Sequence, residues 1–310
     1  MINQIKRDYK DNKLNKNDFI SSMFNSHQLL FEYVAFLKQT EISSIEIIAG
    51  EGVIFKTLPH GVKLFCKEND KRSAPFEIMN FDEYEKGDSF MIHRLIGKDF
   101  TVFDIGANIG WYSMNIAKQI ETGNIICFEP VPQTFGLLKK NIQINGFKNI
   151  EINNLGLGEK EGEHIFYVSQ NTSVSSSSAN ITQDANSNQI SCKVTTLDKF
   201  VSEKSIPKID FIKCDVEGAE LFVYKGGLET INKFKPIVFS EMLRKWSAVF
   251  GYHPNDIITL FTELNFSCFF NEEDKLVEIK SIVDSTAATN FFFLHNEKHK
   301  HLIEKFSVKN

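Results

Sequence analysis

The chain has 310 residues and a mass of 35.5 kDa, a length that fits one large domain or two modest ones. Hydrophobic residues make up 42% of the chain and charged residues 24%, a globular composition that excludes wholesale disorder. The 35 Lys and Arg residues are outnumbered by 40 Asp and Glu residues, which gives a net charge of −5. We therefore predict no nucleic-acid partner, because an acidic protein has no general attraction to a phosphate backbone.

The cysteines and the hydropathy pattern indicate the cellular compartment of the protein. Five widely spaced cysteines without a CxxC motif fit neither a disulfide framework nor a zinc ribbon. The first 16 residues are polar, and no run approaches the roughly 20 apolar residues that a membrane-spanning helix needs. We predict a cytoplasmic protein without a membrane span. The sequence leaves its oligomeric state open.

The amino-terminal part of the chain has its own pattern. Phe24, Leu30 and Val34 belong to a helical periodicity within residues 1–40. Residues 46–66 have an extended pattern interrupted by glycines and a Pro-His-Gly turn. These features predict a helical and β-rich extension over residues 1–87, which would supply acceptor or oligomer contacts, ahead of a main domain over residues 88–310.

The main domain alternates strand and helix patterns, after a short helix at 88–96. Strands are predicted at 101–105, 124–128, 149–153, 209–213, 237–240, 265–270 and 290–295. Helices are predicted at 111–120, 132–145, 217–231 and 254–264. Such alternation predicts an α/β fold with a parallel sheet and helices on both faces. The last two strands lack an intervening helix, which indicates an antiparallel edge, and the polar segment 169–189 reads as a surface loop or a lid.

The most informative motif is Asp-Ile-Gly-Ala-Asn-Ile-Gly at residues 104–110, where the first strand turns into the first helix. Its G-x-x-x-G spacing differs from the G-x-G-x-x-G that binds a pyrophosphate, which disfavours a nicotinamide-dependent dehydrogenase. Asp104 would repel a diphosphate but would suit a cationic amino-acid group. Glu129 follows Gly106 by 23 residues, where nucleotide-binding folds place an acid that binds ribose hydroxyls. A cationic nucleoside without phosphates fits both features, and S-adenosylmethionine is such a molecule.

Several motifs together resemble the FkbM family of S-adenosylmethionine-dependent methyltransferases. They are residues 104–110, Phe-Glu-Pro at 128–130, Thr-Leu-Asp at 196–198, and 210–220 with the Lys-Gly-Gly that follows at 225–227. The resemblance covers about residues 88–243. It implies a Rossmann-like class I methyltransferase sheet of seven mostly parallel strands with an antiparallel last strand. It also implies methylation of a hydroxyl on a small-molecule or saccharide acceptor, in surface polysaccharide, glycolipid or natural-product biosynthesis. The expected cofactor-binding residues are Asp104, Gly106, Asn108, Gly110, Glu129, Pro130 and Asp215.

Methylation of a hydroxyl requires a group that accepts its proton, or a metal that acidifies it. Asp215 follows the fourth strand beside the cofactor crevice, Glu241 ends the fifth strand, and His253 comes a dozen residues later. We predict these three as catalytic residues, acting as a base with a helper. Asp215 and Glu241 alternatively supply ligands of a Mg or Mn ion.

Other functions remain open at this stage. An amino-methylating nucleic-acid enzyme would carry an Asn/Asp-Pro-Pro-aromatic tetrapeptide after the fourth strand, where this chain has Cys-Asp-Val-Glu at 214–217. A lipid or peptide acceptor and a non-catalytic binding or scaffold module are the remaining alternatives.

Overall fold

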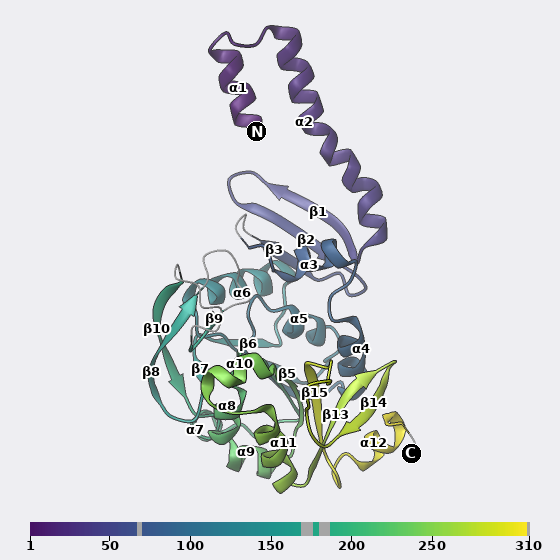
Figure 1. Ribbon diagram of the computed structural model, residues 1–310, viewed down its shortest axis with the longest axis vertical. Coiled ribbons are helices and arrows are strands. Elements are labelled where there is room, and N and C mark those ends of the chain that lie inside the picture. The colour runs from purple at the N-terminus through teal and green to yellow at the C-terminus, as the bar shows by residue number, and fades with distance from the viewer. Residues whose placement is uncertain (67–69, 169–175, 180–186, 309–310) are drawn as a thin grey trace.

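The computed structural model describes residues 1–66, 70–168, 176–179 and 187–308 (Figure 1). The chain begins with two helices, α1 (Ile2–Lys10) and α2 (Lys16–Phe36), followed by the antiparallel strands β1 (Ile42–Ile48), β2 (Gly52–Thr57) and β3 (Lys63–Cys66). Helices α3 (Ala74–Phe81) and α4 (Lys86–Leu95) lead into the main domain. The helical and β-rich character predicted for this part is present. No helix of the described chain is long and apolar enough to cross a membrane.

The main sheet has eight strands in the order β14-β13-β15-β12-β11-β4-β5-β6. Strands β6, β5, β4, β11 and β12 are parallel, whereas β15 is antiparallel to both of its neighbours. The seven predicted strands are β4 (Thr101–Ile105), β5 (Asn124–Phe128), β6 (Ile150–Asn153), β11 (Phe211–Cys214), β12 (Ile237–Glu241), β13 (Phe266–Glu272) and β15 (Asn290–His295). The eighth, β14 (Lys275–Ile279), pairs with β13 as a hairpin at the edge.

Alternation along the strands creates two hydrophobic cores, one on each face of the sheet. Val102 and Ile125 face α4, α5 (Trp111–Ala117) and α6 (Pro132–Asn145). Phe103 and Ile126 face α7 (Leu197–Glu203), α8 (Glu220–Lys225), α9 (Leu228–Phe234) and α11 (Pro254–Glu263). Short helices α10 (Arg244–Ser247) and α12 (Lys300–Phe306) complete the fold.

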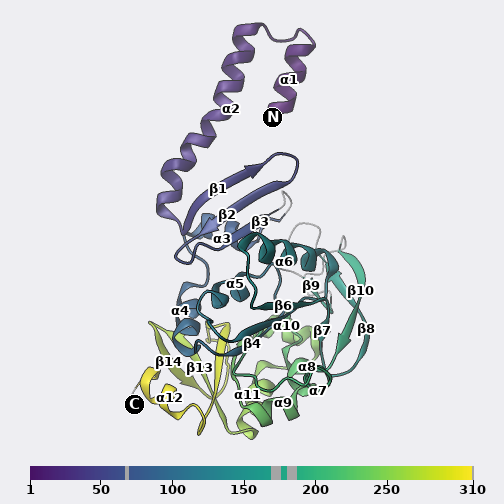
Figure 2. The same ribbon diagram turned by 180° about the vertical axis from the view of Figure 1, so that it is seen from behind.

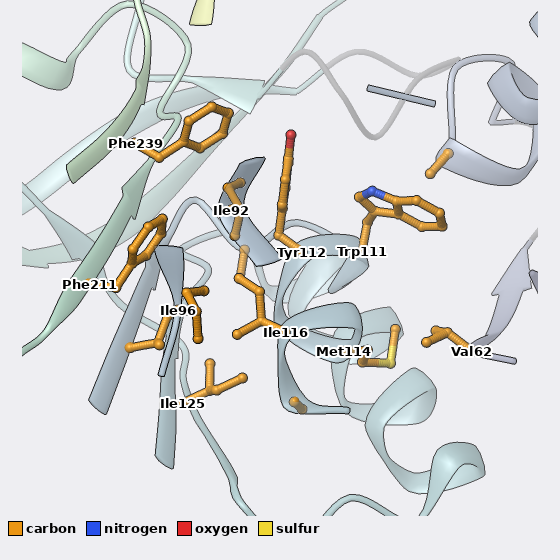
Figure 3. Close-up of a cluster of buried hydrophobic side chains, with 14 of the residues drawn as sticks. Val62, Ile92, Ile96, Trp111, Tyr112, Met114, Ile116, Ile125, Phe211 and Phe239 are labelled. Carbon is orange, nitrogen blue, oxygen red and sulfur yellow. The ribbon is translucent and has the colours of Figure 1, made fainter. Parts of the chain in front are cut away.

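The amino-terminal strands share the first of these cores. Val62 and Leu64 of the extension are fully buried against it, and Figure 3 shows Val62 beside Met114 of α5. The side-chain amide of Asn141 on α6 accepts from the backbone N–H of Phe65 at 2.7 Å. Residues 42–81 therefore pack as part of the main domain, and a division at residue 87 stays a prediction.

Two local predictions differ from the structure. The helix predicted over 217–231 is two helices, α8 and α9, separated at Gly226. A Cβ atom at Gly226 would lie 2.0 Å from the carbonyl oxygen of Gly158, so a passing loop touches the backbone there. The second difference is a small sheet of order β7-β10-β8-β9, formed by β7 (Gly156–Leu157), β8 (Gly162–Val168), β9 (Ser176–Ser177) and β10 (Asn188–Thr195). Of the predicted loop or lid at 169–189, the structure describes residues 176–179 and 187–189. The rest of this segment lies outside the described residues.

Candidate active site

A cavity opens at the carboxyl ends of β4, β5 and β11, where parallel sheets bind their ligands. Its walls come from the predicted motifs and from the amino-terminal extension. The lining residues are Arg72, Ser73, Ala74, Tyr84, Gly106, Ala107, Asn108, Ile109, Trp111, Tyr112, Glu129, Pro130, Phe166, Lys213, Asp215, Val216 and Glu217.

The turn after β4 is shaped by Gly106, which has a left-handed φ of +76°. A Cβ atom at this position would lie 1.9 Å from the backbone oxygen of Asp215. Only glycine fits there, because any side chain would collide with the loop after β11. The close approach brings two strand ends together around one cavity. Gly110, in contrast, does not line the cavity, and a Cβ atom there would lie 2.7 Å from the side chain of Leu138.

Glu129 lies at the end of β5 and is 5% exposed. Its two carboxylate oxygens accept from the backbone N–H groups of Asn108 and Val131, each at 3.0 Å. Burial raises the pKa of Glu129 to about 7, although these two hydrogen bonds oppose the shift. Each carboxylate oxygen still has a second lone pair, so the side chain is oriented by the backbone and retains acceptor capacity toward the cavity.

A buried ion pair network lies under the cavity floor. The ammonium of Lys213 on β11 is 3.4 Å from Asp104 and 3.5 Å from Asp215, and it donates to the carbonyl of Gly106 at 2.7 Å. Burial alone would lower the pKa of Lys213, but Asp104 and Asp215 hold it above its usual value. Lys213 was not among the predicted site residues, although its place two residues before Asp215 on a strand puts both on one side.

Asp104, one of the expected cofactor-binding residues, is not among the side chains that line the cavity. It is fully buried, accepts a hydrogen bond from the Ser113 hydroxyl, and faces Lys213. The ammonium of Lys213, 3.4 Å away, balances its charge. Binding of a cationic group by Asp104 stays a prediction, and in the structure its carboxylate faces the ammonium of Lys213.

Four carboxylates gather on the side of the cavity nearest β11 and β12. Asp215 and Glu217 line it, and Glu241 and Glu85 lie close enough for their charges to interact. Burial and the charge of Asp215 raise the pKa of Glu217 and of Glu241 well above the usual range. One oxygen each of Asp215 and Glu217 is buried without a hydrogen-bond partner among the described residues. Their hydrogen-bonding capacity is therefore not used by the described residues.

The extension and α5 supply an aromatic wall. The rings of Tyr84 and Trp111 meet edge to face at 5.6 Å, and the indole N–H of Trp111 is buried with no acceptor among the described residues. The hydroxyl of Tyr112 donates to Glu85, and in Figure 3 it points away from Ile116 and the hydrophobic cluster. Burial, opposed by this hydrogen bond, raises the pKa of Glu85 to about 7. Sequence reasoning missed Tyr84 and Glu85, which precede the recognised motifs, and it assigned Trp111 and Tyr112 only to a helix.

A second cavity of about 340 Å³ adjoins the first and shares Gly106, Pro130, Phe166 and Val216 with it. Its other walls are mostly apolar and include Phe128, Leu155, Leu157 and Phe222. The loop between the two cavities is fixed by Glu220, which is 1% exposed and accepts from the backbone N–H groups of Val216 and Gly218 at 3.0 Å each. Together the cavities form one elongated site, apolar at one end and acidic at the other.

Comparison with known proteins places this site in a family. The methyltransferase FkbM domain matches residues 104–268, more than half of the chain. The chain belongs to the FkbM methyltransferase family. The order of its main sheet, with an antiparallel strand inserted between β12 and β13, is that of a class I methyltransferase. The recognition made from the sequence motifs is confirmed, and β14 is added to the seven strands expected for the family.

Individual relatives are distant. The hexuronic acid methyltransferase AglP of Haloferax volcanii is 28% identical over 189 residues, which cover 59% of this chain and 71% of that protein. The 2-O-methyltransferase NoeI of Sinorhizobium fredii is 26% identical over 171 residues, which cover 49% of this chain and 69% of that protein. A crystal structure of an FkbM methyltransferase from Methylobacillus flagellatus aligns with a TM-score of 0.42 and 15% identity, over 64% of this chain and 44% of that one.

The matches also differ in extent. Methyltransferase 1 of Beauveria bassiana is 25% identical over 147 residues, 41% of this chain, and the alignment spans 58% of that protein. The chain thus covers little more than half of this relative and less than half of the FkbM methyltransferase of known structure.

Two predictions for this FkbM methyltransferase concern residues around His253 and a metal ion. His253 is the N-cap of α11: its Nδ1 accepts from the N–H of Asn255 at 3.1 Å, and Asp256 completes a capping box. It lines a different cavity, with Arg244 and Asp284, and is not among the residues that line the cavity at the ends of β4, β5 and β11, so its catalytic role stays a prediction. Among the described residues, no three His, Cys, Asp or Glu side chains are arranged to hold a metal ion. A Mg or Mn site at Asp215 and Glu241 stays a prediction, and we derive no step through a metal.

Proposed function

We propose that this FkbM methyltransferase transfers a methyl group from S-adenosylmethionine to a hydroxyl of a saccharide. The observation that carries the proposal is one elongated site with an apolar cavity at one end, Glu129 in the middle and buried carboxylates at the other end. The names of AglP and NoeI, a hexuronic acid methyltransferase and a 2-O-methyltransferase, support a sugar hydroxyl as the acceptor.

Each part of the cofactor has a matching environment in the proposed site. The flat adenine suits the apolar walls of the second cavity, where Pro130 and Val216 lie between the two cavities. Glu129 would accept from both ribose hydroxyls, and the hydrogen bonds from Asn108 and Val131 that orient its carboxylate support this assignment. The amino-acid part then extends past Gly106 toward the Asn108 turn. When bound, S-adenosylmethionine supplies the methyl group and a positive charge.

The carboxylates at the acidic end would bind and deprotonate the acceptor hydroxyl. Asp215 is paired with Lys213, and its carboxylate oxygens would accept a hydrogen bond that orients the hydroxyl. Glu217 has no such cation at contact distance among the described residues, and its pKa is raised by burial and by Asp215. A carboxylate with a raised pKa is the stronger base, so we assign proton acceptance to Glu217, with Glu241 behind it. A nearby positive charge would lower the pKa of Glu217 and favour its ionised form.

The rim of the cavity indicates which saccharides to test. Arg72 lines the opening, and its guanidinium is largely exposed although it pairs with Glu77 at 2.5 Å. A guanidinium binds a carboxylate in a bidentate manner, so an acidic sugar would gain a contact that a neutral sugar lacks. Tyr84 and Trp111 offer the aromatic faces and the free indole N–H against which a sugar ring would pack.

The test is transfer of labelled methyl groups to a panel of uronic-acid and neutral saccharides. With an accepted substrate, we expect Glu217→Gln to reduce kcat roughly 100-fold or more, because a positioned base contributes about that factor. The affinity for S-adenosylhomocysteine should stay within about twofold, and the matched control Glu229→Gln, on the exposed side of α9, should behave like the wild type. Cofactor binding without transfer to any acceptor would refute catalysis and favour a binding module.

A further inference from the structure

Helix α2 is long and leaves its apolar side chains in solvent. It spans 21 residues, all of them described, and none is buried. Near its start the ring of Phe19 stacks on Tyr9 of α1 at 4.3 Å, and just past its end Leu37 packs on the main core. Helix α1 has nine residues and reaches only about half of the roughly 32 Å length of α2. Both ribbon views show the two helices projecting from the body of the protein (Figures 1 and 2).

One line of residues on α2 has the spacing of a coiled-coil seam. Ile20, Phe24, His27, Phe31 and Val34 follow one another at intervals of four, three, four and three residues, and we call them the α2 stripe. The exposed fractions of its four apolar members are 53%, 61%, 67% and 65%. Intervals that average 3.5 residues keep a line of side chains facing one partner helix along its length. The stripe contains no Lys, Arg, Asp or Glu.

The exposed area is sufficient for an interface. With roughly 150–200 Å² for each large apolar side chain, the stripe and the adjacent Leu30 expose on the order of 500 Å² per copy. Two such faces together bury about 1,000 Å², the size at which specific interfaces begin. A helix of this length also gains most of its stability from packing of an apolar face, which α2 lacks within the described chain.

The charge of the segment selects the kind of partner. Residues 1–36 carry five Lys and Arg residues (6, 7, 10, 13 and 16) and four Asp and Glu residues (8, 11, 18 and 32), which nearly cancel. Helices that lie on lipid surfaces are rich in Lys and Arg on their polar side, and α2 itself has a single one, Lys16. A heptad stripe is complementary to an identical stripe, which is the basis of a twofold symmetric dimer.

We propose that the α2 stripe is a dimerisation surface and that its partner is the α2 stripe of a second copy of this chain. The proposal is independent of the methyl acceptor and of the catalytic assignments. Pairing would cover the apolar side chains that α1 leaves exposed. It would also give the projecting helices of the extension a fixed position relative to the body.

Sedimentation velocity of the full chain tests the proposal. We expect the wild type to sediment as a dimer of twice 35.5 kDa, or 71 kDa. The double variant Phe24→Glu and Phe31→Glu places two charges in the stripe and should sediment at 35.5 kDa. The matched control, Ser21→Glu and Gln28→Glu, carries the same charges at the same seven-residue spacing outside the stripe and should remain dimeric.

Further measurements distinguish a loss of dimerisation from a loss of folding and from binding of the stripe to lipid. The Phe24/Phe31 variant should keep the far-UV circular dichroism and the S-adenosylhomocysteine affinity of the folded body. If it does not fold, the milder variant Phe24→Ala and Phe31→Ala should still raise the dimer dissociation constant at least tenfold. A wild-type chain that is monomeric at all concentrations would overturn the proposal, as would a control that dissociates equally. Flotation of a monomeric wild type with phosphatidylglycerol vesicles would also overturn it and assign the stripe to lipid.

Discussion

Replacement of Lys213 by Met tests whether the ion pair network under the cavity holds the site together. The Lys213 side chain is 3% exposed, and its ammonium contacts Asp104, Asp215 and the carbonyl of Gly106. Methionine fills a similar volume and removes only the charge and the donors. The substitution leaves the fully buried Asp104 with the Ser113 hydroxyl as its remaining partner among the described residues.

The expected cost is large because one partner of a buried ion pair is removed. Breaking such a pair costs about 3–5 kcal/mol, since the remaining carboxylate stays buried without its counter-charge. The lost hydrogen bond to Gly106 adds about 1 kcal/mol. For a domain of this size we expect Tm to fall by roughly 10 °C.

Urea denaturation and thermal melts of three variants measure this cost. Lys213→Met should be strongly destabilised, and the double variant Lys213→Met and Asp104→Asn should recover at least half of the loss, because it removes the unpaired charge as well. The control Lys199→Met breaks only the exposed ion pairs with Glu161 and Glu203, and it should cost less than about 1 kcal/mol. A loss for Lys213→Met no greater than for the control, or no recovery in the double variant, would refute the network as a source of stability.

The remaining predictions concern the cofactor side of the site. Gly106→Ala should weaken S-adenosylhomocysteine binding at least tenfold in calorimetry, because the new Cβ atom would lie 1.9 Å from the carbonyl oxygen of Asp215. The control Gly136→Ala on α6, where a Cβ atom meets open space, should bind S-adenosylhomocysteine with the wild-type affinity. Ribose hydroxyls that donate to Glu129 would lower its pKa from about 7, so cofactor binding should release protons and become tighter from pH 6 to pH 8. Glu129→Gln should abolish that pH dependence. Equal binding enthalpies in two buffers of different ionisation enthalpy would show that no proton is released and would contradict the prediction. The same carboxyl binds its proton more tightly in the folded protein than in the unfolded chain, whose value is 4.5. Its stabilising contribution is complete below pH 4.5 and is lost as pH rises through about 7, so Tm of the unliganded protein should fall over that interval less in Glu129→Gln than in the wild type.

The sequence by itself determined the elements of the main domain and the turn that holds the cofactor motif. Buried strands such as 101–105 and 124–128 are short apolar runs bounded by turn residues, and this local pattern survives in the fold with the same bounds. Gly106 and Glu129 were recognisable because their spacing follows from the length of one strand-helix-strand unit. Local sequence patterns do not predict a feature that depends on contact with a residue far along the chain. The break between α8 and α9 depends on the Gly158 carbonyl, which no helical periodicity reveals.

The tertiary structure decided which charged side chains reach the cavity. Asp104 and Asp215 look alike as acids at strand ends, yet Lys213 lies between them, so that Asp104 is buried beneath the floor and only Asp215 lines the cavity. His253 is close to Glu241 in sequence, but a capping box at the start of α11 directs it elsewhere. Burial and mutual charge set the protonation of the carboxylate cluster. Both depend on distances between separate elements, and a linear sequence does not contain those distances.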